Sequence, residues 1–280
     1  NNWDAWDIDI FYEGAATNVL AGEQENGIDL KFKYSVGKNS SLQQTISLAK
    51  HSKRLDFKTH VNWYEKHRML RVAFPVDVHS DKASYDIQYG FVKRPTHRNT
   101  SWDMARFEVV GHKYADISNE DFGVALLNDC KYGYKIHENA IDLNLLRSTN
   151  NPDPDADQGD HEFTYSLLPH TGRLIESNVM KEATFLNRPI YVFCGFISKT
   201  TELPITLTGN GLTLEVIKKA EKDEMLIIRV VESCGKFSTG KLESISKETK
   251  WIETDLMESD NGDIHCGKSL QIKLTPFEIM

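Results

Sequence analysis

The sequence has few cysteines, and none of them is close to another. The four cysteines of the 280-residue chain are Cys130, Cys194, Cys234 and Cys266, and no C-x-x-C pair occurs. This spacing argues against a zinc cluster, and so few cysteines in a chain of this length argue against a disulfide framework. We therefore expect reduced thiols in a cytoplasmic protein.

Long apolar runs and an excess of basic charge are also missing. The longest apolar stretch, residues 189–197, is about half of what a membrane helix needs. No basic and apolar leader opens the chain, so no signal peptide is expected. The formal net charge is −8, with 33 Lys and Arg against 41 Asp and Glu. An acidic chain without a basic stripe argues against a nucleic acid partner, and the short apolar stretch argues against a membrane.

The common catalytic motifs are absent from the sequence. The ten histidines form no H-x-x-x-H or H-E-x-x-H pattern, and there is neither a glycine-rich phosphate loop nor a G-x-S-x-G elbow. From its residues alone, the chain offers no complete catalytic constellation and no metal site.

What the sequence does contain is a series of short stretches in which apolar and polar residues alternate. Residues 55–63, 70–78, 85–91, 141–145 and 163–167 follow this period of two, which places one face of a strand in a core. Strands at such short intervals predict an all-β chain, with antiparallel sheets in a sandwich or barrel. Strands do not alternate with helices, which excludes a Rossmann or TIM fold.

The pattern also predicts two helices and two domains. Residues 41–49 and 177–186 have helical spacing, and Pro189 ends the second stretch. A further set of short strands follows Pro204, at residues 205–207, 212–216, 225–231, 251–252 and 270–274, with charged turns at 218–224 and 259–263. We therefore expect a boundary near Lys199, with one β domain over residues 1–198 and a smaller one over residues 199–280.

Three segments combine aromatic and polar groups in ways that strand patterning does not require. Trp3 and Asp4 are the residue types of sugar sites, because an indole stacks on a pyranose and a carboxylate accepts hydroxyl hydrogen bonds; core or interface positions are the other interpretation. Residues 94–108 are either a binding loop or a loop held by its own Arg–Asp pairs. Residues 127–133 have the composition of a β-turn, in which Cys130 is expected to be inert.

A fourth segment joins an arginine to an acidic loop. Arg147 is in phase with the apolar positions of 141–145, so its guanidinium is expected to end an apolar face and must be paired or face a cleft. The loop that follows includes Asp157 and His161. Its spacing is not that of an EF-hand, and two prolines interrupt it. A role in a site and a structural role, through Asp–Pro turns and an internal Arg–Asp pair, both stay open.

These segments resemble the glycoside hydrolases of family 38, and most closely their cytosolic and bacterial α-mannosidase branch. The matching stretches are W-D-A-W-D-I-D at 3–9, R-P-T-H-R-N-T-S-W-D-M-A-R-F-E at 94–108, L-L-N-D-C-K-Y-G at 126–133, L-L-R-S at 145–148, A-D-Q-G-D-H-E-F-T-Y-S-L-L-P-H at 156–170 and L-T-P-F-E-I at 274–279. The resemblance covers nearly the whole chain. It implies part of a mutarotase-like β supersandwich, without its first strands, followed by a smaller C-terminal β-sandwich.

The resemblance further implies that the chain is the non-catalytic C-terminal part of a retaining α-mannosidase. Such an enzyme hydrolyses terminal α-linked mannose from glycans. In the family, an N-terminal catalytic domain supplies the aspartate nucleophile, the acid/base carboxyl and the ligands of a divalent metal, zinc or cobalt. We therefore expect no catalytic residue and no cofactor in this chain. Its expected partners are that catalytic domain and a mannose-containing glycan, and the parent enzyme is expected to be a homo-oligomer.

The β region of the family packs against the catalytic domain and lends residues to the rim of the active site. Arg147 matches a family arginine that reaches the active-site side, and it is the first candidate for substrate binding. Asp157 and His161 lie in the adjoining loop. The remaining candidates are expected at the domain interface or an outer subsite: Trp3, Asp4, Trp102 and Asp103.

Two other functions are compatible with a β-sandwich. A stand-alone carbohydrate-binding module would have to expose the face that meets the catalytic domain, as an apolar patch or through self-association. A mutarotase-like epimerase shares the sandwich and uses a His/Glu pair, for which the sequence gives no fixed spacing. Mannose binding by the chain alone favours the module, and anomer interconversion without hydrolysis favours the epimerase.

Overall fold

A computed structural model describes residues 4–6, 8, 10–15, 23–25, 29–195 and 203–280 of the chain. The chain divides into two compact units, the first formed by Asn1–Asp86 with Val92–Ile190 and the second by Ile87–Phe91 with Tyr191–Met280. The predicted boundary near Lys199 falls within residues 196–202, which lie outside the described residues. In the described parts of the chain, no helix is both long and apolar enough to span a bilayer.

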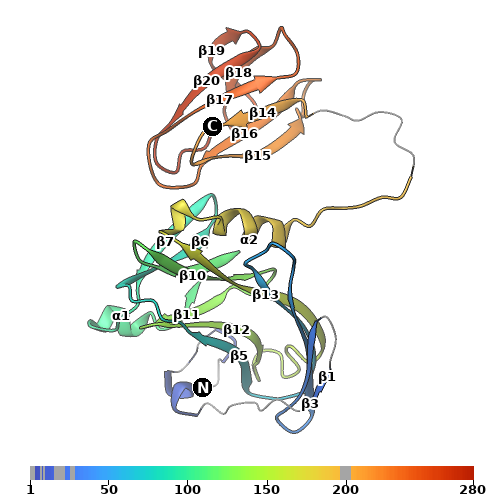
Figure 1. Cartoon of the computed structure of the whole chain (residues 1–280), viewed down its shortest axis with the longest axis vertical. Helices are drawn as coiled ribbons and strands as arrows, with labels where there is room; N and C mark the ends of the chain where they lie inside the picture. Colours follow the sequence, from blue (N-terminus) through green and yellow to red (C-terminus); the bar gives the residue numbers. More distant parts are fainter. Residues whose placement is uncertain (1–3, 7, 9, 16–22, 26–28, 196–202) are drawn as a thin grey trace. The chain divides into compact units, whose positions relative to one another are not determined.

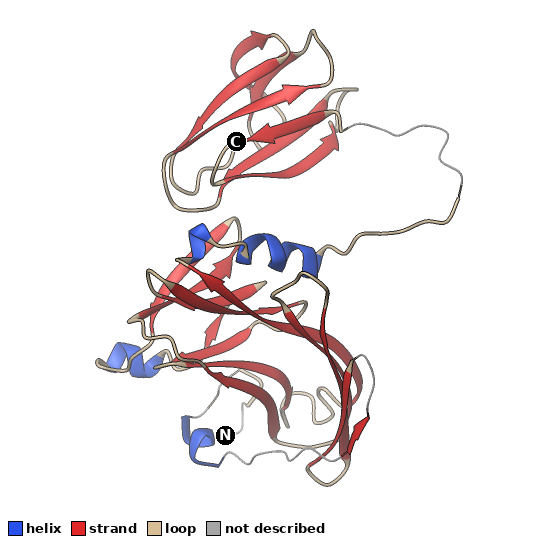
Figure 2. Cartoon of the chain, viewed as in Figure 1, coloured by secondary structure: helices blue, strands red, loops and turns tan. Residues whose placement is uncertain are grey.

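Two β-sheets build the first unit (Figures 1 and 2). One has nine strands in the order β1-β2-β3-β4-β13-β10-β9-β6-β7, and the other has four in the order β5-β12-β11-β8. The strands of these two sheets are β1 (Glu23–Glu25), β2 (Leu30–Val36), β3 (Ser40–Leu48), β4 (Leu55–Trp63), β5 (Arg68–Pro75), β6 (Lys82–Ile87), β7 (Gly90–Pro95), β8 (Val109–Val110), β9 (Tyr114–Ser118), β10 (Phe122–Asn128), β11 (Gly133–His137), β12 (Ala140–Ser148) and β13 (Gly159–Thr171). The helical segments are η1 (Ile10–Ala15), α1 (Ser101–Ala105), η2 (Leu174–Glu176) and α2 (Val179–Asn187).

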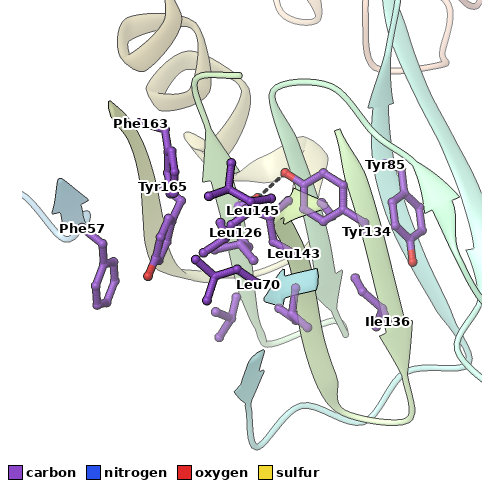
Figure 3. Close-up of a cluster of buried hydrophobic side chains, with 14 of the residues drawn as sticks. Phe57, Leu70, Tyr85, Leu126, Tyr134, Ile136, Leu143, Leu145, Phe163 and Tyr165 are labelled. Carbon is purple, nitrogen blue, oxygen red and sulfur yellow. Dashed lines mark hydrogen bonds between the residues drawn. The ribbon is translucent and has the colours of Figure 1, made fainter. Parts of the chain in front are cut away.

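The core of the first unit lies between the two sheets. On β4, every second residue from Phe57 to Trp63 is buried, as a strand with one face in a core requires. Side chains of the larger sheet, such as Phe163, belong to the same cluster as side chains of the smaller sheet, such as Leu143 (Figure 3). The prediction of an all-β chain with a large sandwich is therefore confirmed, and so are strands at 55–63, 141–145 and 163–167.

The predicted helix at residues 41–49 is wrong. This segment is strand β3, in which Ser40, Leu42 and Gln44 are buried in turn. The apolar residues that suggested a helix, at 42, 46 and 48, are all even-numbered and therefore also share one face of a strand. Pairing decides the outcome, because β3 lies between β2 and β4 and hydrogen-bonds to both.

The predicted single strand at residues 85–91 is a hairpin. Strand β6 ends at Ile87, and β7 begins at Gly90. Tyr89 lies between them with a φ of 57°. A residue with a left-handed backbone cannot continue an extended strand, so a turn forms at Tyr89. The alternation of apolar residues runs on through this turn and therefore does not show where one strand ends and the next begins.

Helix α2 covers the outer face of the larger sheet. The prediction of a helix at 177–186 is confirmed, although the helix begins at Val179 and ends at Asn187. Val179 and Ala183 are fully buried, and α2 packs on β10 and β9. Leu168 of β13 is also buried, although its neighbours Leu167 and Pro169 are only half-buried. The larger sheet thus has one face in the sandwich core and part of the other face under α2.

The second unit is a smaller β-sandwich, as the sequence predicts. Its sheets have the orders β14-β17-β20, β15-β16 and β18-β19. Its strands are β14 (Ile205–Thr208), β15 (Leu212–Lys219), β16 (Leu226–Glu232), β17 (Ser238–Ser244), β18 (Lys250–Thr254), β19 (Asp260–Cys266) and β20 (Ser269–Leu274). Buried residues of β14, β16, β17, β18 and β20 form one core around Trp251. The predicted turn at 259–263 is misplaced, because β19 already begins at Asp260, and the Asp255 carboxylate accepts hydrogen bonds that close the turn before it.

Candidate functional site

Arg147 lies near the end of β12, directly after an irregularity in the strand. The register between β12 and β5 shifts between Asn144 and Leu146, so Leu145 and Leu146 are both buried. After the shift, the buried position is Ser148, whose hydroxyl accepts a hydrogen bond from the Trp63 indole N–H. The sequence-based placement of Arg147 on the apolar face is therefore wrong, since the bulge puts it out of phase with the core.

Three of the other predicted site residues surround Arg147. Its guanidinium Nη2 donates to the backbone carbonyl oxygen of Asp4. Its backbone N–H donates to the Asp157 carboxylate, with 2.8 Å between N and Oδ2. The His161 Nε2 lies 2.8 Å from the carbonyl oxygen of Asp157. The structure thus gathers Asp4, Arg147, Asp157 and His161 into one group, called the Arg147 cluster below.

The Asp4 carboxylate fastens the start of the acidic loop. It is buried, with 7% of the residue exposed, and it accepts hydrogen bonds from the backbone N–H groups of Asn150 at 2.8 Å and Asn151 at 3.0 Å. His67 Nδ1 lies 3.0 Å from its Oδ2. Burial alone would raise the pKa of Asp4, but these hydrogen bonds outweigh it and lower the pKa to about 2. Asp4 is therefore a clamp on the loop, and the partners Asn150, Asn151 and His67 were not expected from the sequence.

The rest of the acidic loop is held by its own contacts. Asp157 has a left-handed φ of 57°, and the Gln158 side chain donates to the Glu65 carbonyl oxygen at 2.8 Å. Lys66 pairs with Asp155 at 3.1 Å. Within the part of the chain that the structure describes, no three His, Cys, Asp or Glu side chains are grouped to hold a metal ion. These residues do not fit a metal centre.

Trp102 and Asp103 lie on the short helix α1, and Trp3 lies outside the described residues. The Asp103 carboxylate accepts hydrogen bonds from the Thr100 N–H and hydroxyl, while the Asp103 N–H donates to the Thr100 hydroxyl. This capping box shows that Asp103 serves the helix. Trp102 is 73% exposed.

Two arginines of the 94–108 loop contact residues outside the loop, so they do not support the interpretation of a loop held by its own Arg–Asp pairs. Arg98 forms a two-pronged pair with Glu13, at 3.0 and 2.8 Å. Arg94 lies over the Tyr85 ring, 4.7 Å from its centroid. The β-turn prediction for residues 127–133 agrees with an Asn128 side chain that accepts from the Lys131 N–H at 2.6 Å. Partial desolvation and the neighbouring Asp129 raise the pKa of the Cys130 thiol to about 11, which favours its protonated form.

A largely buried ionic network on the smaller sheet was not predicted from the sequence. Arg71 of β5 lies between Asp142, at 2.6 Å, and Glu108, at 2.9 Å. Lys135 of β11 links Asp142 to Glu13, at 3.4 and 3.3 Å, and the Tyr12 hydroxyl donates to Glu108. Through Tyr12 and Glu13, the network fastens η1 to the sheet. In the sequence, only the charged residues on β5, β11 and β12 indicated this network, and their spacing does not show which of them form ion pairs.

Comparison with known proteins identifies the family. Residues 1–155 match the model of the glycosyl hydrolases family 38 C-terminal domain, and residues 211–280 match that of the family 38 C-terminal beta sandwich domain. Alpha-mannosidase G of Dictyostelium discoideum is 41% identical over 99% of this chain and 27% of its own length, and alpha-mannosidase 2C1 of Homo sapiens is 36% identical over 99% of this chain and 28% of its own length.

A solved structure with the same fold is the alpha-mannosidase from Enterococcus faecalis V583. It superposes with a TM-score of 0.77 at 16% identity, over 94% of this chain and 35% of that one. The chain thus spans little more than a quarter of the length of the curated relatives, and its matches lie in their C-terminal domains. The chain belongs to glycosyl hydrolase family 38, of whose enzymes it forms the C-terminal, non-catalytic part.

Proposed function

We propose that this chain belongs to a retaining α-mannosidase that removes terminal α-linked mannose from glycans. The names of the relatives support this activity. In our proposal, the chain packs against an N-terminal catalytic domain, and the Arg147 cluster forms part of the rim of the active site. The observation that carries the proposal is the fixed position of Arg147, whose guanidinium and backbone N–H are both bound within the cluster.

The proposed division of labour follows from the chemistry of retaining glycosidases. One carboxylate attacks the anomeric carbon, and a second carboxyl acts first as acid and then as base; both belong to the catalytic domain, as does a zinc or cobalt ion. An arginine held in place at the rim donates charge-assisted hydrogen bonds to sugar hydroxyls and loses little side-chain entropy on binding. Asp157 and His161 set the loop beside it, and exposed Trp102 offers an apolar ring at the domain interface or an outer subsite.

Replacing Arg147 by alanine in the full-length enzyme is expected to lower kcat/KM by about tenfold or more, the effect of one lost charge-assisted contact. Release of nitrophenol from an aryl α-mannoside, with zinc or cobalt supplied, measures it. Arg68→Ala is the matched control, because Arg68 faces Ser148 across the β5–β12 pair and its exposed side chain pairs with Glu65. Wild-type kinetics in Arg147→Ala, with an unchanged melting temperature, would remove Arg147 from the site.

A stand-alone carbohydrate-binding module is the second candidate, and exposed Trp6 and Trp102 are the observation in its favour. The nitrophenol-release assay distinguishes the module from the non-catalytic part of a mannosidase when the 280-residue chain is compared with the full-length protein. Turnover only in the longer protein, with no mannose binding by the chain in calorimetry, supports the non-catalytic role. Saturable mannose binding by the chain alone supports the module.

We also propose a cytoplasmic location for the protein. The four cysteines support it, because all four are free thiols in the structure. Cell fractionation with an antibody against this chain tests the location, and recovery in a secreted or organellar fraction would overturn it.

Homo-oligomerisation of the parent enzyme stays a prediction, which size-exclusion chromatography with light scattering can check.

A further inference from the structure

Three chain connections meet at one end of the first unit. They are the β2–β3 turn at residues 37–39, the β4–β5 connection at residues 64–67, and the acidic loop between β12 and β13 at residues 149–158. The strand register places the start of β3 and of β13 beside the end of β4, and the end of β12 beside the start of β5. The β2–β3 turn therefore lies at the same end of the sandwich as the Arg147 cluster.

The β2–β3 turn is built around the side chain of Glu65, which belongs to the β4–β5 connection. Glu65 is 7% exposed, and its Oε1 accepts from the backbone N–H groups of Lys38 at 2.9 Å and Asn39 at 3.0 Å. The Ser40 hydroxyl donates to the same oxygen at 3.4 Å. A Cβ on Gly37 would lie 2.2 Å from the Glu65 carboxyl carbon, and this residue has a φ of 61°. Glycine at this position thus leaves the room that the carboxylate fills.

The backbone of Glu65 holds the end of the acidic loop. Its carbonyl oxygen accepts a hydrogen bond from the Gln158 side chain at 2.8 Å. Gln158 directly follows Asp157, whose carboxylate accepts from the backbone N–H of Arg147 at 2.8 Å. Whereas Asp4 fastens the start of the loop, Glu65 fastens its end, next to the residue that contacts Arg147. One residue therefore joins the β2–β3 turn to the loop that holds the arginine.

We propose that Glu65 is a positioning residue for Arg147, an inference that rests on the proposed place of the Arg147 cluster at the rim of the active site. The carboxylate anchors the β4–β5 connection to the β2–β3 turn, and the anchored backbone fixes the loop through Gln158. A loop that is fixed in advance loses less entropy when substrate binds, and it keeps the arginine in its productive geometry. Glu65 does this without touching the sugar, because its side chain is buried against the turn.

Two replacements of Glu65 in the full-length enzyme separate its hydrogen bonds from its charge. The three donors from residues 38–40 all reach Oε1, whereas Oε2 lies 3.6 Å from Arg68 Nε. Glu65→Gln keeps a carbonyl oxygen for these donors, so its kcat/KM for an aryl α-mannoside is expected to stay within about twofold of the wild-type value. Glu65→Ala leaves the donors unpaired and is expected to lower kcat/KM by about fivefold, because the loop shifts.

A double-mutant cycle with Arg147→Ala shows whether Glu65 acts through the arginine. An arginine that is absent cannot be misplaced, so adding Glu65→Ala to Arg147→Ala is expected to change kcat/KM by less than about twofold. A residue that only supports the fold would lower the activity in either background. Losses that multiply in the double variant, to about fiftyfold in all, would overturn the proposal.

Gln158→Ala keeps the test decisive if Glu65→Ala folds poorly. This replacement removes the hydrogen bond to the loop and leaves the contacts between Glu65 and the β2–β3 turn in place. It is expected to lower kcat/KM by about as much as Glu65→Ala, and again only while Arg147 is present. Gln43→Ala is the matched control, because Gln43 is exposed on β3, and its kcat/KM should match the wild-type value.

The outcomes distinguish this inference from the proposed function. Wild-type kinetics in Arg147→Ala would overturn both, since the arginine would then have no role at the site. A loss in Arg147→Ala together with wild-type kinetics in both Glu65→Ala and Gln158→Ala would overturn the positioning role alone. An equal loss in Glu65→Gln and Glu65→Ala would also overturn it, because the charge of Glu65 and not its hydrogen bonds to the turn would then matter.

Discussion

Replacing Arg71 by methionine is expected to lower the free energy of unfolding by about 3–5 kcal/mol, because it removes one partner from a buried ionic group. Arg71 is the cation between two carboxylates, Asp142 at 2.6 Å and Glu108 at 2.9 Å. The Arg71 side chain is 13% exposed, so water replaces little of the lost charge, and Lys135 remains beside Asp142 only, which leaves Glu108 without a cation. Methionine has a similar apolar stem, so the variant tests the charge and not the packing. Urea denaturation followed by circular dichroism measures the loss.

The control for this prediction is a pair with the same chemistry at the surface. Lys58 and Glu162 lie 2.7 Å apart on β4 and β13, but their side chains are 66% and 59% exposed. Lys58→Met is therefore expected to leave the free energy of unfolding almost unchanged, because water and salt screen an exposed pair. A second replacement, Glu108→Gln in the Arg71→Met protein, should recover part of the stability, since it removes a carboxylate that has lost its cation. Equal losses of unfolding free energy in Arg71→Met and Lys58→Met would show that burial does not increase the contribution of the network to stability.

The sequence predicted most of the sheet framework, because the faces of strands are a local property. A period of two at residues 55–63 or 163–167 shows which side chains enter a core before any partner strand is known. The same local property misled at residues 41–49, where a spacing of 42, 46 and 48 fits both a helix and a strand. Only the neighbouring strands β2 and β4 decide between the two.

The candidate site was harder to predict, because its geometry depends on irregularities and on distant contacts. No pattern in residues 141–148 reveals the bulge that moves Arg147 out of phase with the core. The hydrogen bond from Arg147 to Asp4 joins residues 143 positions apart. The resemblance to family 38 selected both segments as candidates, but it could not say that the Asp4 carboxylate binds the loop while its carbonyl oxygen binds the arginine.

The Asp4 carboxylate makes the loop sensitive to acid. Its pKa in the folded state is about 2, against an ordinary value of 3.8, because hydrogen bonds from Asn150, Asn151 and His67 outweigh the effect of burial. A lowered pKa means that the folded state favours the ionised form. The stabilisation is therefore complete above about pH 4, and it is lost as the pH falls from there toward 2. This part of the acid transition should be missing from Asp4→Asn, which urea denaturation at several pH values can detect.

Asp4→Asn in the full-length enzyme is expected to lower kcat/KM by about hundredfold, because a displaced loop and a displaced arginine spoil the geometry of the rim together. The two Asp4 oxygens accept from different N–H groups, Oδ2 from Asn150 and Oδ1 from Asn151, so an amide of the same shape must turn its NH₂ toward a donor.

Asp160→Asn is the matched control, because that carboxylate is exposed at the start of β13 and contacts Asn62 at the surface. Its kcat/KM should stay within about twofold of the wild-type value, as for most surface replacements. Full activity in Asp4→Asn would mean that the loop keeps its position without the carboxylate, whereas an equal loss in both variants would point to a general effect on the fold. A selective loss in Asp4→Asn larger than that of Arg147→Ala would show that Asp4 positions the whole cluster and not the arginine alone.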